Sequence, residues 1–349
     1  MKIGLVGLPG SGKTTCFRIL SGQAGVDSRH GAQLATVTIP DARLDGLFEV
    51  EKANKKVCAD VTFMDFEALH KGAASSGELG LHTVAGDVDA FALVIQCFGD
   101  LDHLGNPLDP KSDLEALFVE MSLSDLRIME KHLERLHEGP KSDRPPKTVE
   151  LMERCIAHLG QGSPLRELQL SEDGLRYLKG FTPLTMMPFL VVCNVAEDDL
   201  QGQRVVKMRN RADAVGVPHI MICAELEEEL AQLPEEDRKD FLAEYGLQAP
   251  ARDRFILACS EVLDLVTFFT VNENEARAWT VPRDTPAPEA AGKVHTDMQE
   301  GFIRAEVTSL DHFHQQGSLQ ACKDKGYTRV EGKDYVVQDG DILQIRFSR

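Results

Sequence analysis

The sequence lacks an apolar run long enough to cross a bilayer, and its start reaches a glycine-rich loop too early for a signal peptide. None of its eight cysteines forms a Cys-x-x-Cys pair, so the spacing suggests neither a zinc site nor a disulfide framework. The formal net charge of −18 argues against broad adhesion to nucleic acid or anionic membranes. We therefore expect a cytoplasmic globular protein, and 349 residues suggest two or three domains.

Short runs rich in Val, Ile and Leu predict buried strands, and helical stretches separate several of them. The runs lie at 2–6, 34–39, 57–64, 91–97, 188–193 and 217–223. This alternation is typical of an α/β domain with a mostly parallel sheet. After residue 265 the pattern changes to β-rich segments such as Thr-Phe-Phe-Thr-Val and Asp-Tyr-Val-Val, with a proline-rich loop at 281–288. These segments predict a small β-rich terminal domain.

The alternation breaks between about residues 100 and 183, where two apolar series follow 3-4-3 spacing. The series are Leu126, Met129, Leu133 and Leu136, then Val149, Met152, Ile156 and Leu159. The spacing predicts an antiparallel helical hairpin inserted into the α/β domain. Two amphipathic helices packed on the sheet would give the same spacing, and periodicity alone does not separate the two arrangements.

The first apolar run leads directly into the phosphate-binding pattern Gly7-Leu-Pro-Gly-Ser-Gly12-Lys13-Thr14. A glycine-permitted loop that opens a helix offers successive backbone N–H groups to the phosphates of a nucleotide. Lys13 is expected to reach the β and γ phosphates, and the Thr14 hydroxyl is expected to ligate Mg²⁺. The predicted phosphate-binding residues are Pro9, Gly10, Ser11, Gly12, Lys13, Thr14 and Thr15.

Three later strand ends carry polar residues that suit the rest of a nucleotide site. Asp65 ends the run at 57–64 and is the second predicted contributor to the Mg²⁺ site, although an Asp there is also a common turn residue. Guanine is usually held by Asn-Lys-x-Asp, whereas this chain has neither that lysine nor the aspartate. The predicted base-contacting residues are Asn194, Val195 and Glu197 after one strand, and Cys223, Ala224 and Glu225 after another.

Several motifs along most of the chain resemble the YchF-type or Obg-like ATPases of the translation-factor class of P-loop proteins. They include Gly7-Leu-Pro-x-x-Gly-Lys, Ile39-Pro-Asp-Ala-Arg-Leu-Asp45, Asn194-Val-Ala-Glu197, Ala276-Arg-Ala-Trp-Thr280, Gly301-Phe-Ile-Arg-Ala-Glu306 and Glu331-Gly-Lys-Asp-Tyr-Val-Val-Gln-Asp-Gly-Asp341. The resemblance implies a G-domain interrupted by a coiled-coil-like hairpin and followed by a β-grasp TGS domain. The expected limits are 1–110 and 184–265 for the G-domain, 111–183 for the hairpin and 266–349 for the TGS-like domain.

The resemblance also implies a Mg²⁺-dependent switch protein that prefers ATP to GTP and hydrolyses it slowly. Asn194 and Glu197 match the signature to which the family's ATP preference is attributed. Lys13 is the expected catalytic cation, and Leu69 stands where Ras-like enzymes keep a water-orienting glutamine. His82 is the candidate for the family's catalytic histidine. Ribosome or RNA contact through the TGS-like domain, a role in stress responses and a monomeric state are further expectations from the family.

This chain departs from the family pattern at several positions. Gly10-Ser-Gly-Lys-Thr14 replaces Asn-Val-Gly-Lys-Ser, Ala68 stands at a glycine position, and both switch segments are shorter. These departures leave open a nucleotide-sensing adaptor with little hydrolysis. A GTP-binding protein is a further alternative, because Glu197 could accept from guanine. A small-molecule kinase also fits the loop, but no arginine-bearing lid is evident. Residues 266–349 carry 10 Lys and Arg against 13 Asp and Glu, so their net charge gives RNA contact little support.

Overall fold

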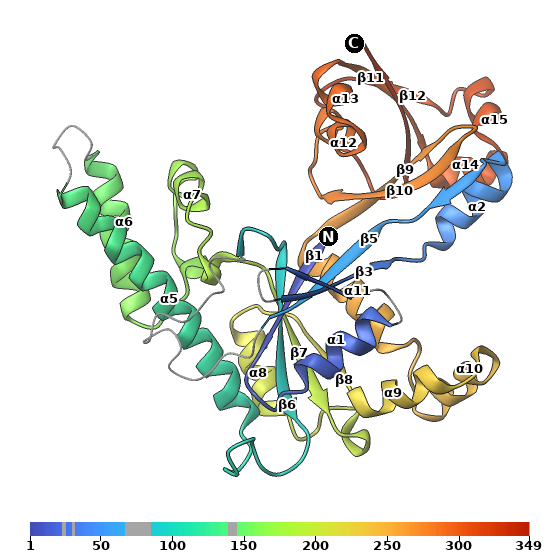
Figure 1. The fold of residues 1–349 in the computed structure, drawn as a ribbon. Coiled ribbons are helices and arrows are strands. Elements are labelled where there is room, and N and C mark those ends of the chain that lie inside the picture. The colour runs from blue at the N-terminus through green and yellow to red at the C-terminus, as the bar shows by residue number, and fades with distance from the viewer. Residues whose placement is uncertain (23–25, 30–31, 67–84, 139–144, 349) are drawn as a thin grey trace. The chain divides into compact units, whose positions relative to one another are not determined.

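The computed structural model describes residues 1–22, 26–29, 32–66, 85–138 and 145–348, and its contacts divide the chain into two compact units (Figure 1). Lys2–Ala35 and Thr62–Cys259 form the unit that we call the P-loop unit. Met1, Thr36–Val61 and Ser260–Arg349 form the C-terminal unit. A segment from the first fifth of the chain is therefore part of the C-terminal unit.

A seven-stranded sheet in the order β2-β3-β5-β1-β6-β7-β8 positions the phosphate loop. Its strands are β1 (Lys2–Gly7), β2 (Val26–Arg29), β3 (Ala32–Thr38), β5 (Asp60–Asp65), β6 (Ala90–Cys97), β7 (Phe189–Val195) and β8 (His219–Ile222). Strands β5, β1, β6, β7 and β8 pair in parallel, so their carboxyl ends share one edge of the sheet. Every residue of β6 and β7 is buried, as expected for strands covered on both faces.

The helices of the P-loop unit include the hairpin predicted from the apolar spacing. They are α1 (Lys13–Ser21), α5 (Pro110–Glu138), α6 (Pro146–Gly160), α7 (Glu172–Lys179), α8 (Val206–Ala214), α9 (Ala224–Gln232), α10 (Glu235–Glu244) and α11 (Ala251–Val262). The amino-terminal part of α5 packs with α8 on the sheet, and its carboxyl-terminal part pairs with α6. Met129, Met152 and Leu159 from the two predicted series are buried between the helices of the hairpin.

The fully buried carboxylate of Asp125 fixes α5 to the short 3-10 turn at Leu184–Met186. It accepts hydrogen bonds from the backbone N–H groups of Leu184 and Thr185, both over 2.8 Å, and from the Thr185 hydroxyl over 2.6 Å. A buried carboxylate is tolerated when such donors satisfy its oxygens. The start of β7 is thus held in a defined position relative to α5.

The C-terminal unit is built on a six-stranded sheet in the order β12-β11-β13-β9-β10-β4. Its strands are β4 (Lys55–Val57), β9 (Leu265–Val271), β10 (Glu275–Pro282), β11 (Phe302–Ser309), β12 (Arg329–Glu331) and β13 (Asp341–Phe347). The helices of the unit are α2 (Ala42–Glu51), α12 (Ala287–Val294), α13 (Thr296–Glu300), α14 (Leu310–Gln316) and α15 (Leu319–Asp324). Apolar side chains of α12 pack on one group of strand residues, and those of α2 and α14 pack on another.

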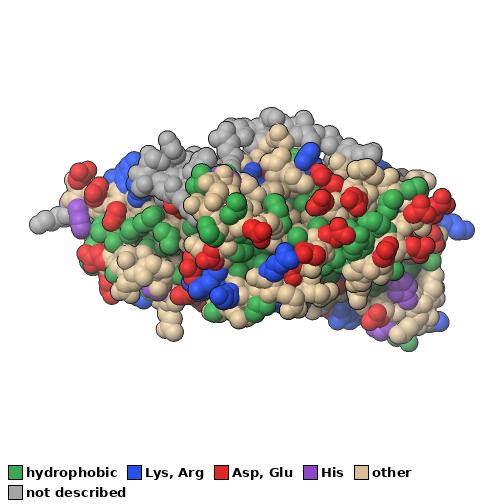
Figure 2. Space-filling model, turned by 90° about the horizontal axis from the view of Figure 1, so that it is seen from below, with side chains coloured by type: hydrophobic (Ala, Val, Ile, Leu, Met, Phe, Trp, Pro, Cys, Tyr) green, Lys and Arg blue, Asp and Glu red, His purple; other side chains and the backbone are tan. Residues whose placement is uncertain are grey.

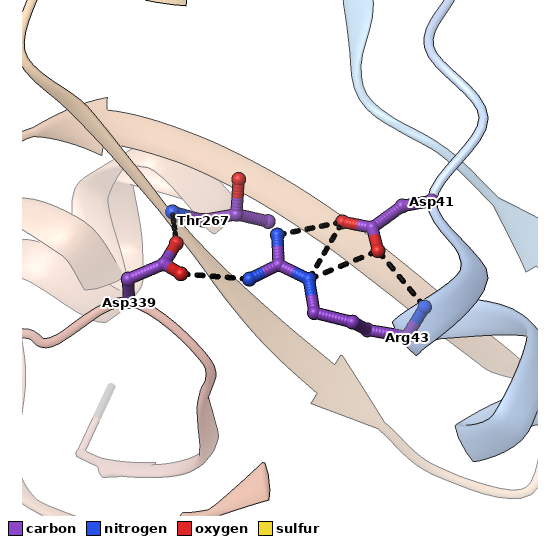
Figure 3. Close-up of polar contacts among 4 residues, drawn as sticks. All are labelled: Asp41, Arg43, Thr267 and Asp339. Carbon is purple, nitrogen blue, oxygen red and sulfur yellow. Dashed lines mark hydrogen bonds and ion pairs between the residues drawn. The ribbon is translucent and has the colours of Figure 1, made fainter. Parts of the chain in front are cut away.

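The segment 36–61 joins the C-terminal unit through both apolar and polar contacts. Leu44 and Leu47 of α2 are fully buried against strands β9, β10 and β13, and β4 pairs in parallel with β10. Figure 3 shows the polar contact: the Arg43 guanidinium binds the carboxylate of Asp41 over 2.8 Å and that of Asp339 over 2.7 Å. The second oxygen of Asp339 accepts the backbone N–H of Thr267 in β9 over 2.8 Å.

The predicted fold class is confirmed, whereas two predicted strands are different in the structure. The run at 57–64 is divided between β4 and β5, which belong to different sheets. Asp-Tyr-Val-Val is not a strand: Val336 makes only an isolated bridge with Pro286.

The predicted domain limits stay a proposal, and the contacts group 36–61 with 260–349. None of the described helices is both long and apolar enough to cross a membrane.

Candidate functional site

The loop between β1 and α1 has the backbone that its glycines allow. Gly10 and Gly12 have φ angles of 83° and 81°, in the left-handed region where a side chain is strained. A Cβ on Gly7 would lie 2.6 Å from the Ser11 hydroxyl oxygen and 2.7 Å from the Val94 carbonyl oxygen. The α1 hydrogen bonds begin when Cys16 N–H donates to Gly12 O over 2.8 Å. The amino-terminal end of α1 therefore opens directly from the loop, as an anion site requires.

A cavity of about 330 Å³ lies on this loop and is lined by residues 8–15, Gln33, Asp65 and Phe66. The Lys13 ammonium is buried in it, where it forms an ion pair with Asp65 and donates to the Phe66 carbonyl oxygen. The Thr14 hydroxyl donates to the other carboxylate oxygen of Asp65 over 3.1 Å. The loop thus brings a cation, a hydroxyl and a carboxylate together at one end of the cavity.

The oxygens of Thr14 and Asp65 fit a hard divalent cation. Mg²⁺ prefers oxygen ligands and is usually held by one or two protein groups together with phosphate and water. In the described part of the chain, no cluster of three or more His, Cys, Asp and Glu side chains forms a metal site of its own. A Mg²⁺ ion here would therefore depend on a bound polyphosphate for most of its ligands.

Asn194, at the end of β7, holds two parts of the predicted site together. Its side chain is buried, its Nδ2 donates to the Ser11 carbonyl oxygen over 3.1 Å, and its Oδ1 accepts the Ala224 N–H over 3.2 Å. A Cβ on Gly12 would lie only 2.2 Å from Asn194 Nδ2, so the amide also requires glycine there. The phosphate loop, the end of β7 and the turn after β8 are thereby fixed to one another.

The remaining predicted base-contacting residues differ in exposure. Val195, Cys223 and Ala224 are buried, whereas Glu197 and Glu225 are exposed. Burial raises the pKa of the Cys223 thiol, and the neighbouring carboxylates of Glu225 and Glu197 raise it further. Glu197 Oε1 accepts a hydrogen bond from the Tyr245 hydroxyl over 2.9 Å. The two exposed carboxylates are therefore the acceptors available to a ligand on this side.

The structure brings together the predicted loop residues, Asp65 and the residues after β7 and β8. Leu69, His82 and Ala68 lie outside the described residues, so their predicted roles stay predictions. Gln33, the Phe66 carbonyl and Tyr245 also belong to this region and were not predicted from the sequence. Gln33 and Phe66 lie beside predicted strand ends, but no motif marks them. Tyr245 carries no local signal because its partner is 48 positions away.

Comparison with known proteins finds relatives that match along the whole chain. The "Ribosome-binding ATPase YchF" of Haemophilus ducreyi is 35% identical to this chain, and the alignment covers 99% of each of the two chains. The protein of the same name from Bacillus subtilis is 34% identical over 99% of this chain and 98% of the relative.

Two further comparisons agree with these relatives. The family model YchF-GTPase_C, described as "Protein of unknown function (DUF933)", matches residues 265–348. The structure of the Schizosaccharomyces pombe YchF GTPase superposes with a TM-score of 0.83 at 25% identity, covering 99% of this chain and 97% of that one. Full-length coverage at this identity and the shared fold establish the relationship, and the chain belongs to the YchF family.

Proposed function

We propose that this chain is an ATP-binding P-loop ATPase that works as a slow, monomeric switch. The main support for the proposal is the site on the loop after β1, where Lys13, Thr14 and Asp65 meet in one cavity. The YchF relatives in Haemophilus ducreyi and Bacillus subtilis are named ATPases, which supports the same activity here.

Each residue of the cavity has a defined part in this proposal. The N–H groups of residues 10–15 bind the phosphates, and the Lys13 ammonium neutralises the charge on the β and γ phosphates. Thr14 and Asp65 hold Mg²⁺, which supplies further charge neutralisation when it is bound. Attack by water is in line with the leaving oxygen, so positioning and electrostatic stabilisation account for catalysis.

The residues after β7 and β8 are proposed to bind the base. Asn194 keeps the loop and the turn after β8 at a fixed separation, and Glu197 and Glu225 offer acceptors. An exposed carboxylate with one free oxygen suits the amino group of adenine. We therefore propose ATP as the preferred nucleotide.

The binding test compares wild type with Lys13→Ala in titrations with labelled ATP, with Mg²⁺ and with chelator. We expect binding in wild type that requires Mg²⁺, and at least about a tenfold loss in the variant, because a buried cation facing phosphate is removed. Lys207→Ala, at an exposed position of α8, is the matched control and should bind as wild type does. Equal affinity of the Lys13 and Lys207 variants would contradict the proposal.

We also propose that the chain binds the ribosome in the cytoplasm, with RNA contact through the TGS-like domain. The full-length relatives from Haemophilus ducreyi and Bacillus subtilis are named ribosome-binding ATPases, which supports this proposal. Figure 2 shows a face on which acidic and basic side chains are interspersed, without a continuous basic area among the described side chains. Contact with RNA would then depend on local groups of Lys and Arg, and such charge contacts weaken as the salt concentration is raised. Co-sedimentation with purified ribosomes at two salt concentrations tests this, and no pelleted protein at low salt would contradict it.

A further inference from the structure

Tyr245 follows the carboxyl end of α10 and binds a carboxylate of the proposed base site. Its hydroxyl donates to Oε1 of Glu197 over 2.9 Å. The phenol ring packs against Phe241, with ring centroids 5.1 Å apart and an interplanar angle of 46°. The ring and its helix therefore hold the hydroxyl at one oxygen of a side chain that is otherwise exposed.

The two purines make different demands on a carboxylate. Guanine presents two neighbouring donors, N1–H and the N2 amino group, which match the two oxygens of an ionised carboxylate. Adenine presents one donor, the N6 amino group, beside the acceptor N1. An ionised carboxylate only accepts hydrogen bonds, so an oxygen placed opposite adenine N1 is repelled. A carboxylate with both oxygens free therefore favours guanine, and one that presents a single oxygen loses this two-point contact while it can still accept from the adenine amino group.

We propose that Tyr245 is a positioning residue that sets the choice of purine, because it holds Oε1 of Glu197 and leaves one oxygen for the base. The proposal rests on nucleotide binding at the P-loop and deepens it. The Asn194 amide has a different part, since it bonds to the Ser11 carbonyl oxygen and to the Ala224 N–H within the protein.

The test is Tyr245→Phe, which keeps the ring that packs on Phe241 and removes only the hydroxyl. Affinities for ATP and GTP are measured by competition against one labelled ATP analogue at constant Mg²⁺. We expect GTP to bind about tenfold more tightly than it does to wild type, while ATP changes by less than about threefold. ITP lacks the N2 amino group, so the substitution should raise its affinity less than it raises that of GTP.

Two controls separate this role from general stabilisation. Tyr177→Phe removes another tyrosine hydroxyl that is hydrogen-bonded, in this case to His132 in the hairpin, and should leave the ATP to GTP ratio unchanged. In a Glu197→Ala background, Tyr245→Phe should no longer alter the ratio, because the residue acts through Glu197.

The outcomes distinguish this inference from the proposed function. An unchanged ratio in Tyr245→Phe, with Lys13-dependent ATP binding intact, would overturn the inference alone. An altered ratio that persists in the Glu197→Ala background would also overturn it. Wild-type protein that binds neither nucleotide would overturn both the proposed function and this inference.

Discussion

The Asn194 side chain donates from Nδ2 to the carbonyl oxygen of Ser11 over 3.1 Å, and this bond fixes the phosphate loop to the end of β7. Through Oδ1 the same amide accepts the N–H of Ala224, at the start of α9. A site for a whole nucleotide needs its phosphate and base ends at a constant separation. In this chain one buried amide provides that separation.

Replacement of Asn194 by alanine should weaken both the fold and the site. The variant leaves the Ser11 carbonyl and the Ala224 N–H without this partner in a buried place, at a cost of about 1–3 kcal/mol in the free energy of unfolding. ATP affinity should fall because the loop and the turn after β8 are no longer held together. Urea unfolding and ATP titration measure the two effects. Asn210→Ala, at an exposed position of α8, is the control, and equal behaviour of the two variants would refute the role given to Asn194.

Arg43 should stabilise the junction of α2 with β9 by a modest amount. The Arg43 side chain is 34% exposed and that of Asp339 is 52% exposed, so the ion pair is partly screened and Arg43→Ala should cost about 1 kcal/mol. The variant also loses the contact between the guanidinium and the Phe269 ring, in which the Arg43 Cζ lies 5.3 Å from the ring centroid. Hydrogen–deuterium exchange of peptide 265–271 should be faster in the variant, because Thr267 N–H bonds to Asp339. Arg43→Lys should recover only part of the protection, since lysine lacks the planar fork; full recovery would argue against this geometry.

The helical hairpin should lose stability as the pH is lowered towards 5. Burial lowers the pKa of His132 from its usual 6.5, and Arg135 lowers it further. The unfolded chain therefore binds this proton more readily, and stability rises with pH between the folded and the unfolded pKa. Stability should decline as the pH falls through about 6.5. Protonation also places a charge on the imidazole beside the Tyr177 hydroxyl and the Phe181 ring. The centroids of the His132 and Phe181 rings are 4.7 Å apart.

Thermal unfolding of wild type and His132→Gln between pH 5 and pH 8 measures this effect. Glutamine does not titrate but can still bond to Tyr177, so the variant should show a smaller decline at low pH. His137→Gln removes an exposed histidine from the same helix and should keep the wild-type slope. If His132→Gln and wild type have identical pH profiles, His132 does not contribute in this way.

The parts of the fold that depend on local sequence were predictable, and the parts that depend on distant partners were not. The phosphate loop follows from its glycines, whose positive φ angles are a local backbone property. The two helices of the hairpin follow from apolar spacing within each helix, whereas their packing on each other does not. By contrast, β4 is only Lys55–Val57, and its place in the C-terminal sheet depends on pairing with β10, far along the chain. Nothing in a short run of mixed polarity specifies such a partner.

The same distinction applies to the site. The sequence predicted that Asn194 and Glu197 follow a strand, but a motif does not reveal that the Asn194 amide bonds inward or that Tyr245 binds Glu197. Those contacts depend on the packing of α9 and α10. Residue exposure thus divides the predicted base-contacting set into a buried amide that supports the site and exposed carboxylates that a ligand can reach.

The most direct test of the account is a side-by-side equilibrium titration of wild-type protein with labelled ATP and labelled GTP, each with and without Mg²⁺. We predict saturable, Mg²⁺-dependent binding of both the labelled nucleotides that is tighter for ATP than for GTP. Absence of ATP binding, or tighter binding of GTP than of ATP, would contradict it.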